Sequence, residues 1–393
     1  MEKMDIIWDG DVASNHSYAI VNREIVQALS CQRVRVNIWG RDREGRLIVP
    51  RTSYPPGSRE YHALGDFLPR AYVRHIWPPD FSRPDLPAAY SDTKSLAAYG
   101  SMRALTTYDD VKFVVIQPWE YGYLPVNWVD PIKENVDEIW AYSEFVKETY
   151  VRSGVDTNKV HVIGCGVNPV NFHPGIQPMV LPTAKHFRFL FVGGAATSRK
   201  GLDVLLSAFT AEFRRDEDVA LVIKDWFYGN IERQIEEFRR RPDCPEIVYI
   251  YRDFSLSEMA ALYSSCQAYV HPFRAEGFGL TVLEAMACGL PVIVTDYGPV
   301  REFCNPANSY LIRSRSIHFP EARVGEWVTC GIPFWAEPNS EHLRELLRRV
   351  FTDQEEGKEK GARAARDALS GWTWEKVASR VMSRLKANLL HLI

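Results

Sequence analysis

Segments typical of buried β-strands alternate with segments of helical period through most of this 393-residue chain. Strands that alternate with helices indicate parallel βαβ units, so the chain is expected to form doubly wound α/β sheets. In the first half a helical pattern spans residues 21–29, and the strand-like runs are MDIIW, VRVNIW, KFVVIQ, DEIWAY and KVHVIG. The Pro-, Tyr- and Trp-rich segment from Pro50 to Tyr99 is expected to be an ordered loop that carries binding surface.

A Pro-dense segment near residues 168–185 separates this half from a second alternating series. The segment has no hydrophobic period, which is typical of a domain boundary. The second series has the strand-like runs HFRFLFVGG, VALVIK, EIVYIY, QAYVHPF, PVIVTD and SYLIR, with helices expected near 200–213, 231–240, 256–265 and 279–289. We therefore expect two Rossmann-like domains, residues 1–175 and residues 185–371.

Composition favours a packed soluble protein without a nucleic-acid partner. Hydrophobic residues make up 46% of the chain, and 47 basic residues against 50 acidic ones leave a net charge of -3. An anionic ligand must therefore be held by local groups. The seven cysteines are scattered without a CxxC pair, which indicates neither a disulfide framework nor a zinc site. With no signal-peptide pattern and no apolar run of membrane-spanning length, we expect a cytoplasmic protein.

The C-terminal segment, residues 372–393, has the pattern of an amphipathic helix. Its apolar stripe consists of Val377, Val381, Leu385 and Leu389, and its basic residues include Lys376, Arg380 and Arg384. We expect the stripe to dock on the protein itself, with the helix crossing back to the N-terminal domain, because the positive charge is modest. Peripheral contact with a membrane surface is the alternative.

Two junctions between a strand and a helix in the second half are specialised for a ligand. Ligands of open parallel sheets bind outside the carboxyl ends of the strands. At the first junction, FVGGAATSRKG, a strand ends at Gly193 and Gly194, and Arg199 and Lys200 stand where the next helix begins. Backbone N–H groups with two cations beside them make an anion site, although solvated cations at a helix start are common.

The second junction is the stretch AEGFGLTVLEAMACG, in which Glu276 precedes the flexible Gly277 and Gly279. Glu284 lies in the middle of an almost wholly apolar helical run, with Thr281 one turn before it. Burial of a carboxylate costs several kcal/mol unless the group is hydrogen-bonded. The two hydroxyls of a ribose would satisfy both of its oxygens.

The stretch EGFGLTVLEAMACGLPVIVTD, with Glu276 and Glu284, resembles the E-x7-E motif of family 4 retaining glycosyltransferases of the GT-B fold. The segments around RKG, GPVREF with Glu302, VHVIGCGVNPVNFHP and WTWEKVASRV are also similar to that family. The resemblance implies two Rossmann-like domains that face each other across a cleft. It further implies transfer of a sugar, with retention, from a UDP- or GDP-sugar to an acceptor glycan, lipid or small molecule, without cofactor or obligatory metal.

The same resemblance implies roles for individual residues. Glu284 would bind the ribose hydroxyls, Glu276 would face the hydroxyls of the donor sugar, and Lys200 would neutralise the diphosphate. The backbone of Gly277, Phe278, Gly279, Leu280 and Thr281 would cradle the diphosphate. A second cation often follows the strand glycine, but Gly194 stands there, so Arg199 or Lys224 in LVIKDW is expected to replace it.

In the first domain the residues expected near the acceptor are less well defined. The family often places a His after the fourth strand, whereas the segment IQPWEYG has Gln117, Trp119 and Glu120 there. We expect Trp119 and Glu120 to lie on the acceptor side. His16 could polarise an acceptor hydroxyl or contact the donor phosphate, or be structural, and Gly10 would allow close approach of a ligand.

Other classes of protein fit parts of the sequence. The DGD of Asp9 and Asp11 looks like a metal motif of another glycosyltransferase fold, but its place on the first strand argues against that role. A dehydrogenase is disfavoured because GxGxxG with a following acidic residue is lacking. A sugar-nucleotide epimerase, a phosphorylase-like enzyme with pyridoxal phosphate and a non-catalytic sugar-nucleotide or glycan-binding protein stay open as alternatives.

Overall fold

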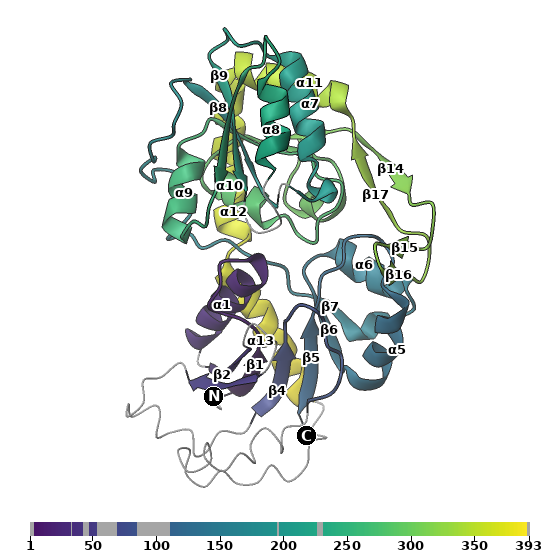
Figure 1. The fold of residues 1–393 in the computed structure, drawn as a ribbon. Coiled ribbons are helices and arrows are strands. Elements are labelled where there is room, and N and C mark those ends of the chain that lie inside the picture. Colours follow the sequence, from purple (N-terminus) through teal and green to yellow (C-terminus); the bar gives the residue numbers. More distant parts are fainter. Residues whose placement is uncertain are drawn as a thin grey trace.

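The computed structural model of the chain has two α/β lobes, one above the other (Figure 1). It describes residues 4–32, 34–41, 47–52, 69–84, 111–194, 196–225 and 231–390. The first half of the chain forms the lower lobe, and the second half forms the upper lobe. Both chain ends lie in the lower lobe, because the last helix returns to it.

A seven-stranded sheet forms the core of the first lobe, in the order β3-β2-β1-β4-β5-β6-β7. All pairs are parallel except β2 with β3. In chain order the strands are β1 (Met4–Asp9), β2 (Val34–Arg41), β3 (Leu47–Thr52), β4 (Pro69–Arg74), β5 (Lys112–Ile116), β6 (Glu138–Ala141) and β7 (Val160–Val162). The order reverses between β1 and β4, and such a switch point is where α/β sheets bind ligands.

The structure corrects one expectation for this lobe. The segment from Pro50 to Tyr99 is not loop throughout, because Pro69–Arg74 forms the central strand β4. Arg74 is buried there since its Nε donates to Asp9 Oδ2 of the neighbouring strand at 2.9 Å. The expected loop character of residues 53–68 and 85–99 concerns a part of the chain outside the described residues.

A six-stranded, wholly parallel sheet forms the core of the second lobe, in the order β10-β9-β8-β11-β12-β13. The strands are β8 (Phe187–Val192), β9 (Val219–Asp225), β10 (Glu246–Tyr251), β11 (Ala268–His271), β12 (Val292–Thr295) and β13 (Ser309–Ile312). The helices of this lobe are α7 (Leu202–Glu212), α8 (Glu232–Arg239), α9 (Leu256–Ser264), α10 (Leu280–Ala287), α11 (Ser340–Thr352) and α12 (Gln354–Gly371). Here the order reverses between β8 and β11. The two Rossmann-like domains expected from the sequence are therefore present.

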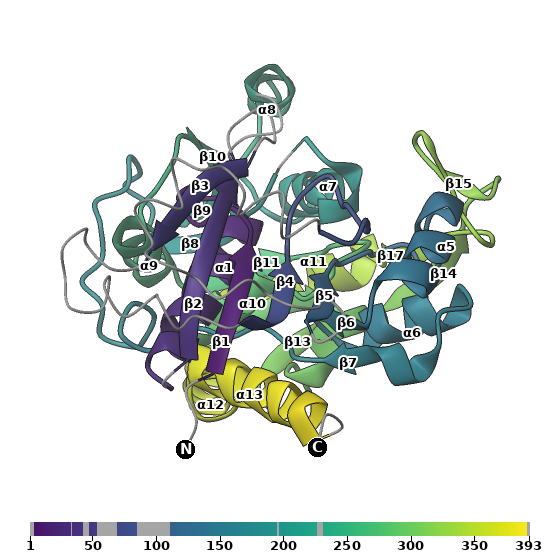
Figure 2. The same ribbon diagram turned by 90° about the horizontal axis from the view of Figure 1, so that it is seen from below.

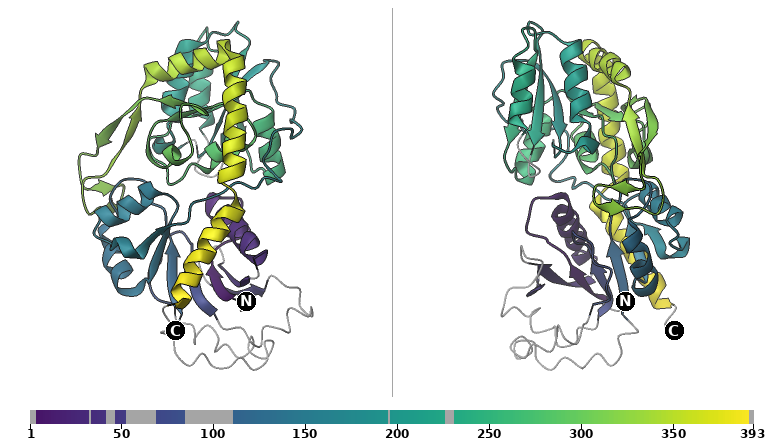
Figure 3. Two further views of the ribbon diagram at one scale, coloured as in Figure 1. Left: turned by 180° about the vertical axis from the view of Figure 1, so that it is seen from behind. Right: turned by 45° about the vertical axis from the view of Figure 1, so that its right-hand side comes forward.

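Short 3-10 turns and the remaining helices complete the two lobes. The turns are η3 (Thr157–Lys159), η4 (Ser198–Lys200) and η5 (Gly298–Glu302). The first lobe has the helices α1 (Ser17–Ser30), α5 (Val126–Asn135), α6 (Glu144–Arg152) and, from the far end of the chain, α13 (Trp374–Leu390). In Figure 3 the yellow α12 runs down the upper lobe and leads directly into α13, which crosses the lower lobe.

The helix α13 docks on the first lobe, as expected from its apolar stripe. It packs against α1, and Val377, Val381 and Leu385 are buried in the same core cluster as Ile25 of α1. The side chain of Leu389 lies outside the described residues. Arg380 Nη1 donates to the carbonyl of Ile163 at 2.9 Å. Within the described residues, no helix is long and apolar enough to cross a membrane.

An arm formed by residues 314–338 leaves the second lobe and reaches the first. It consists of two antiparallel pairs, β14 (Ser314–His318) with β17 (Phe334–Pro338) and β15 (Arg323–Val324) with β16 (Trp327–Val328). Figure 2 shows its tip beside α5. Backbone bonds join the arm to the first lobe, from Cys330 N to Leu124 O at 2.9 Å and from Phe334 N to Tyr121 O at 3.2 Å.

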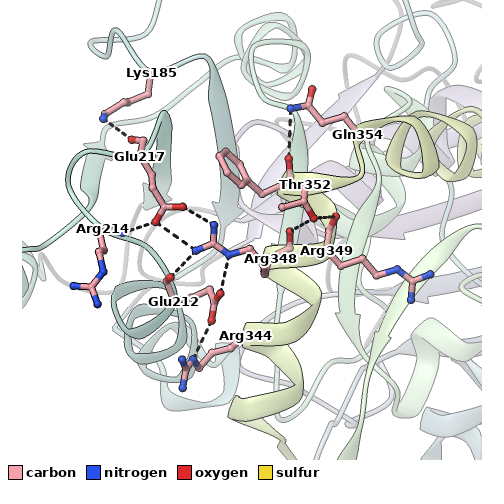
Figure 4. A network of polar contacts seen from close by, with 10 residues as sticks. Lys185, Glu212, Arg214, Glu217, Arg344, Arg348, Arg349, Thr352 and Gln354 are labelled. Carbon is pink, nitrogen blue, oxygen red and sulfur yellow. Dashed lines mark hydrogen bonds and ion pairs between the residues drawn. The ribbon is translucent and has the colours of Figure 1, made fainter.

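A network of charges fixes α11 to α7 on the second lobe, away from these contacts (Figure 4). Arg348 donates to Glu212 at 2.8 Å and to Glu217 at 2.5 Å, and Arg344 donates to Glu212 at 3.2 Å. The carboxylate of Glu217 also accepts from Arg214 N at 2.9 Å. We interpret this network as structural, because it joins neighbouring elements of one domain.

Candidate functional site

Lys200 and Glu276 meet at the switch point of the second sheet. Lys200 lies in η4, which follows β8, and Glu276 follows β11, the neighbouring strand on the other side of the reversal. Lys200 Nζ donates to Glu276 Oε1, and His271 Nε2, at the end of β11, contacts the same oxygen at 2.8 Å. Arg199 Nη1 lies 3.6 Å from the other carboxylate oxygen. The sequence marks the two junctions separately, and the structure brings them into contact.

The electrostatics of this cluster favour charged groups. Burial by itself would raise the pKa of Glu276, but Lys200, the hydrogen bond from His271 and Arg199 together hold it far below the ordinary value. Burial lowers the pKa of Lys200, opposed by Glu276. Burial also lowers the pKa of His271, again opposed by Glu276. Glu276 is therefore an ionised acceptor at neutral pH, with a buried His behind it and two cations in front.

The backbone at both junctions requires glycine. Gly201, which begins α7, has a φ of 72°, and a Cβ there would lie 1.8 Å from the carbonyl oxygen of Pro272. Gly279, before α10, has a φ of 97°. Only glycine tolerates both the left-handed φ and the close approach. These two residues therefore set the position of Lys200 and of the turn after Glu276.

Glu284 lies in α10 and is buried, with 6% of its surface exposed. Tyr263 OH donates to its Oε2 at 2.9 Å and also contacts the carbonyl of Thr281. Burial raises the pKa of Glu284 to about 7, while the bond from Tyr263 lowers it and the nearby charge of Glu24 raises it. One tyrosine only partly offsets the cost of burial, so the carboxylate is suited to further hydroxyl donors.

The turn after Glu276 is in contact with the first domain. Ser143 Oγ donates to the carbonyl of Gly277 at 3.0 Å, and a Cβ on Gly277 would lie 3.0 Å from Pro118 Cβ. Glu120 Oε1 lies 3.7 Å from Arg199 Nη1, so the same guanidinium faces Glu120 and Glu276. A site built around Glu276 thus includes both domains.

Four further residues of the predicted site lie in the second domain, namely Thr281, Phe278, Leu280 and Gly194. Thr281 lies beside Glu284, and its hydroxyl accepts a bond from Tyr269 OH at 2.8 Å. Phe278 points into the core against Phe303, so only its backbone faces the turn. Leu280 is partly buried at the start of α10. At the other junction, the carbonyl of Gly194 accepts a hydrogen bond from Thr197 N at 3.1 Å.

Lys224 occupies the end of β9, but its side chain is buried rather than at the surface. Its Nζ lies over the ring of Phe254, 4.9 Å from the centroid, and donates to the carbonyl of Asp225. Burial lowers its pKa to about 8. These contacts direct the ammonium group to Phe254 and Asp225 rather than to Glu276 or Arg199. Arg199 is therefore the second cation of the cluster.

In the first domain the predicted residues near β1 have structural contacts. His16 caps α1, where its Nδ1 accepts from Ala19 N at 3.2 Å and its Nε2 lies 3.1 Å from Asp11 Oδ2. A Cβ on Gly10 would lie 2.4 Å from Asn22 Nδ2, so the close neighbour of Gly10 is protein. Asp9 is buried and accepts from Tyr72 OH at 2.7 Å.

Trp119 is buried, and its Nε1 donates to the carbonyl of Tyr123 at 2.6 Å. It packs against Trp128 with ring centroids 5.1 Å apart, so it supports the loop. Glu120, its neighbour in the chain, is the residue of this loop that reaches the cluster.

Sequence reasoning missed His75, which follows β4 at the switch point of the first sheet. It is fully buried between Asn22 Oδ1, 2.6 Å from its Nδ1, and Tyr142 OH, 2.7 Å from its Nε2. Burial lowers its pKa to about 3, so the ring is neutral. A position directly after a strand of the sheet would have marked His75 as a candidate, but the sequence pattern predicted a loop where β4 lies.

In sequence, the second domain is similar to glycosyltransferases. Residues 186–322 match the family described as glycosyl transferases group 1. An uncharacterised glycosyltransferase of Methanocaldococcus jannaschii is 28% identical over 168 residues, 43% of this chain and 42% of that protein. The serotype-specific mannosyltransferase WbdA of Escherichia coli is 26% identical over 235 residues, 56% of this chain and 28% of that protein. The chain thus spans less than half the length of these relatives.

The fold as a whole matches that of a solved enzyme. Sucrose-phosphate synthase from Thermosynechococcus elongatus has a TM-score of 0.66 and 18% identity, over 99% of this chain and 100% of that chain. The chain has the two-domain GT-B fold that the sequence predicted. Lys200, Glu276 and Glu284 all lie within the segment that is similar to group 1 glycosyltransferases.

Proposed function

We propose that this protein is a retaining, metal-independent glycosyltransferase that moves a hexose from a UDP- or GDP-sugar to an acceptor hydroxyl. The observation that carries the proposal is the convergence of Lys200, Arg199 and Glu276 at a switch point of the sheet. The buried Glu284 lies in α10, the helix that follows Glu276. The similarity of residues 186–322 to group 1 glycosyltransferases supports the same activity.

Lys200 and Arg199 bind the diphosphate in this proposal. In the free protein their charge is balanced by Glu276, and Arg199 also faces Glu120. The two cations stabilise the diphosphate most strongly as it leaves, because its negative charge increases when the bond to the sugar breaks. The two cations supply this stabilisation at a site of low exposure, where electrostatic interactions are stronger than in water.

Glu284 binds the ribose. Its ionised carboxylate accepts one hydrogen bond from each hydroxyl of the diol, in addition to the bond from Tyr263. The backbone from Gly277 to Thr281 lies between Glu276 and Glu284 and follows the diphosphate. This order places the nucleoside at α10 and the sugar at Glu276.

Glu276 then accepts hydrogen bonds from the hydroxyls of the donor sugar. In the reaction the bond between the anomeric carbon and the diphosphate oxygen breaks, and the electron pair leaves with the diphosphate. The acceptor oxygen attacks the same face, and its proton passes to the departing diphosphate. The first domain supplies the acceptor side, where Glu120 is nearest to the cluster.

No observation favours the epimerase or a phosphorylase, and the intact set of charged groups argues against a binding protein that has lost activity. The test is incubation with UDP- and GDP-hexoses and a panel of sugar acceptors, with NMR of the anomeric proton of the product. A product with the anomeric configuration of the donor is expected. A changed sugar nucleotide formed without acceptor, or an inverted product, would contradict the proposal.

A further inference from the structure

Trp77 is exposed at the switch point of the first sheet. It lies two residues beyond His75, where β4 ends next to β1, and 54% of its surface is exposed. Exposure of this much indole surface to water is unfavourable unless a ligand covers it. Its place at the ligand-binding edge of the sheet distinguishes it from a scattered surface residue.

Two further rings extend this surface. Tyr18 of α1 and Trp77 have ring centroids 6.5 Å apart, and Trp327 of the arm lies 6.4 Å from Trp77 at an interplanar angle of 56°. Tyr18 is itself stacked on His75, with centroids 4.5 Å apart. The three rings come from both domains, because Tyr18 and Trp77 belong to the first domain and Trp327 belongs to the arm of the second.

The surface is formed before any ligand binds. Trp327 is wedged against Trp119 and Trp128, with centroids 6.4 and 5.6 Å away. The adjoining arm backbone bonds to Leu124 and Tyr121 of the first domain. Rigid aromatic side chains lose little conformational entropy when a ligand stacks on them, so such a surface is suited to binding.

A single loop connects this surface to the cluster of Lys200 and Glu276. Gln117 Nε2 donates to Tyr18 OH at 3.0 Å, Trp119 contacts Trp327, and the next residue, Glu120, faces Arg199. The aromatic surface therefore lies on the first-domain side of the same charged site.

We propose that Trp77 and Trp327, flanked by Tyr18, form a stacking subsite for a sugar ring of the acceptor, so that the acceptor is a saccharide. This inference rests on the proposed function. A sugar ring presents C–H groups on its face and hydroxyls on its edge, which suits an aromatic face beside hydrogen-bonding groups. Glu326, the residue before Trp327, is exposed and supplies a carboxylate acceptor for hydroxyls. The carboxylate of Asp80, near Trp77 in the chain, is already paired with Arg74 and Ser82.

The test is saturation-transfer NMR with mannotriose, maltotriose, cellotriose and chitotriose on the full chain with bound UDP or GDP. Wild type is expected to bind at least one trisaccharide, and Trp77→Ala is expected to weaken that binding by about tenfold or more. Trp77→Phe should recover part of it, since a ring is kept. Val180→Ser, at a 94% exposed valine of the interdomain segment, is the control for loss of surface apolar area and should bind as wild type does.

Circular dichroism establishes that Trp77→Ala is folded, and Trp77→Gln serves as a second variant if it is not. Thermal stabilisation by UDP- and GDP-sugars, measured on the same samples, separates the two proposals. Normal stabilisation without trisaccharide binding, or binding equal in Trp77→Ala and wild type, overturns the acceptor subsite alone. Trp77-dependent sedimentation with phosphatidylcholine vesicles, in place of saccharide binding, would show that the surface contacts lipid. Absence of stabilisation by any nucleotide sugar counts against the donor site and the proposed function.

Discussion

The carboxylate of Glu276 accepts a hydrogen bond from Nζ of Lys200, although 76 positions separate the two residues. They follow neighbouring strands, β11 and β8, at the point where the strand order of the second sheet reverses. The contact joins the two junctions of the sequence that are richest in glycine and charge. In the proposed function, this contact holds the Lys200 cation in place before a diphosphate binds.

Replacement of Lys200 by Met is expected to reduce turnover by at least about tenfold, because a cation that stabilises the leaving diphosphate is lost. Steady-state rates with saturating donor measure the effect. Lys224→Met is the matched control, since that lysine contacts Phe254 and Asp225 instead of the cluster. A normal rate in Lys200→Met would move the role to Arg199, which faces the same carboxylate.

Replacement of Glu276 by Gln should reduce turnover more than nucleotide affinity. The variant keeps the shape of the side chain but removes the charge that balances Lys200 and Arg199. Free UDP or GDP is therefore expected to bind as tightly as to wild type or more tightly, while turnover falls by about tenfold or more. Calorimetry gives the affinity, and weaker nucleotide binding with a normal rate would exclude this role.

Replacement of Glu284 by Gln is expected to stabilise the protein at alkaline pH. Burial raises the pKa of Glu284 to about 7 from 4.5, so the folded state prefers the protonated form. Ionisation of Glu284 therefore lowers the free energy of unfolding progressively between pH 4.5 and about 7, and the loss is constant above pH 7. Glu284→Gln should raise the free energy of unfolding by about 1–3 kcal/mol at pH 8 and by little at pH 4.5. Denaturant titration at the two pH values checks this, and an equal change at both would show that ionisation is not the cause.

Donor binding is expected to depend on pH through the same group. A ribose diol donates to the ionised carboxylate, so the dissociation constant should rise by about tenfold per unit as pH falls below 7 and level off above it. The titratable groups around Glu284 include Tyr263 of α9, Glu24 of α1, Tyr269 of β11 and Cys288. Glu24→Gln removes a charge that raises the pKa of Glu284, so its midpoint should lie at lower pH. If the pH midpoint of donor binding is the same in Glu24→Gln as in wild type, the titration belongs to another group.

Hydrophobic period predicted the second domain well because its strands are continuous apolar runs that are buried on both faces. The strand β4 escaped prediction because PRAYVR contains two arginines within a Pro-rich segment. Arg74 is compatible with burial only through Asp9, a contact that sequence does not show. The miss concealed His75 and Trp77 at the end of that strand.

Some residues of the candidate site are marked by the local sequence, and others are placed by tertiary packing. Lys200, Glu276 and Glu284 were predictable because glycines and an out-of-place carboxylate mark them in the sequence. The contact of Glu120 with Arg199, and the position of Trp327 beside Trp77, depend on how two domains and an arm pack. Short strands such as Trp327–Val328 have no period of their own. Their place follows from contacts with the first domain.

The most direct test of the account measures thermal stabilisation and nucleotide release with UDP-, GDP-, ADP-, CMP- and dTDP-sugars, for wild type and for Glu284→Ala. A UDP- or GDP-sugar is expected to stabilise the wild type and to be slowly hydrolysed, whereas Glu284→Ala should show neither effect. Equal stabilisation of both proteins would contradict the assignment of Glu284 to the ribose. If no nucleotide sugar stabilises the wild type, the proposed donor site at Lys200, Glu276 and Glu284 is wrong.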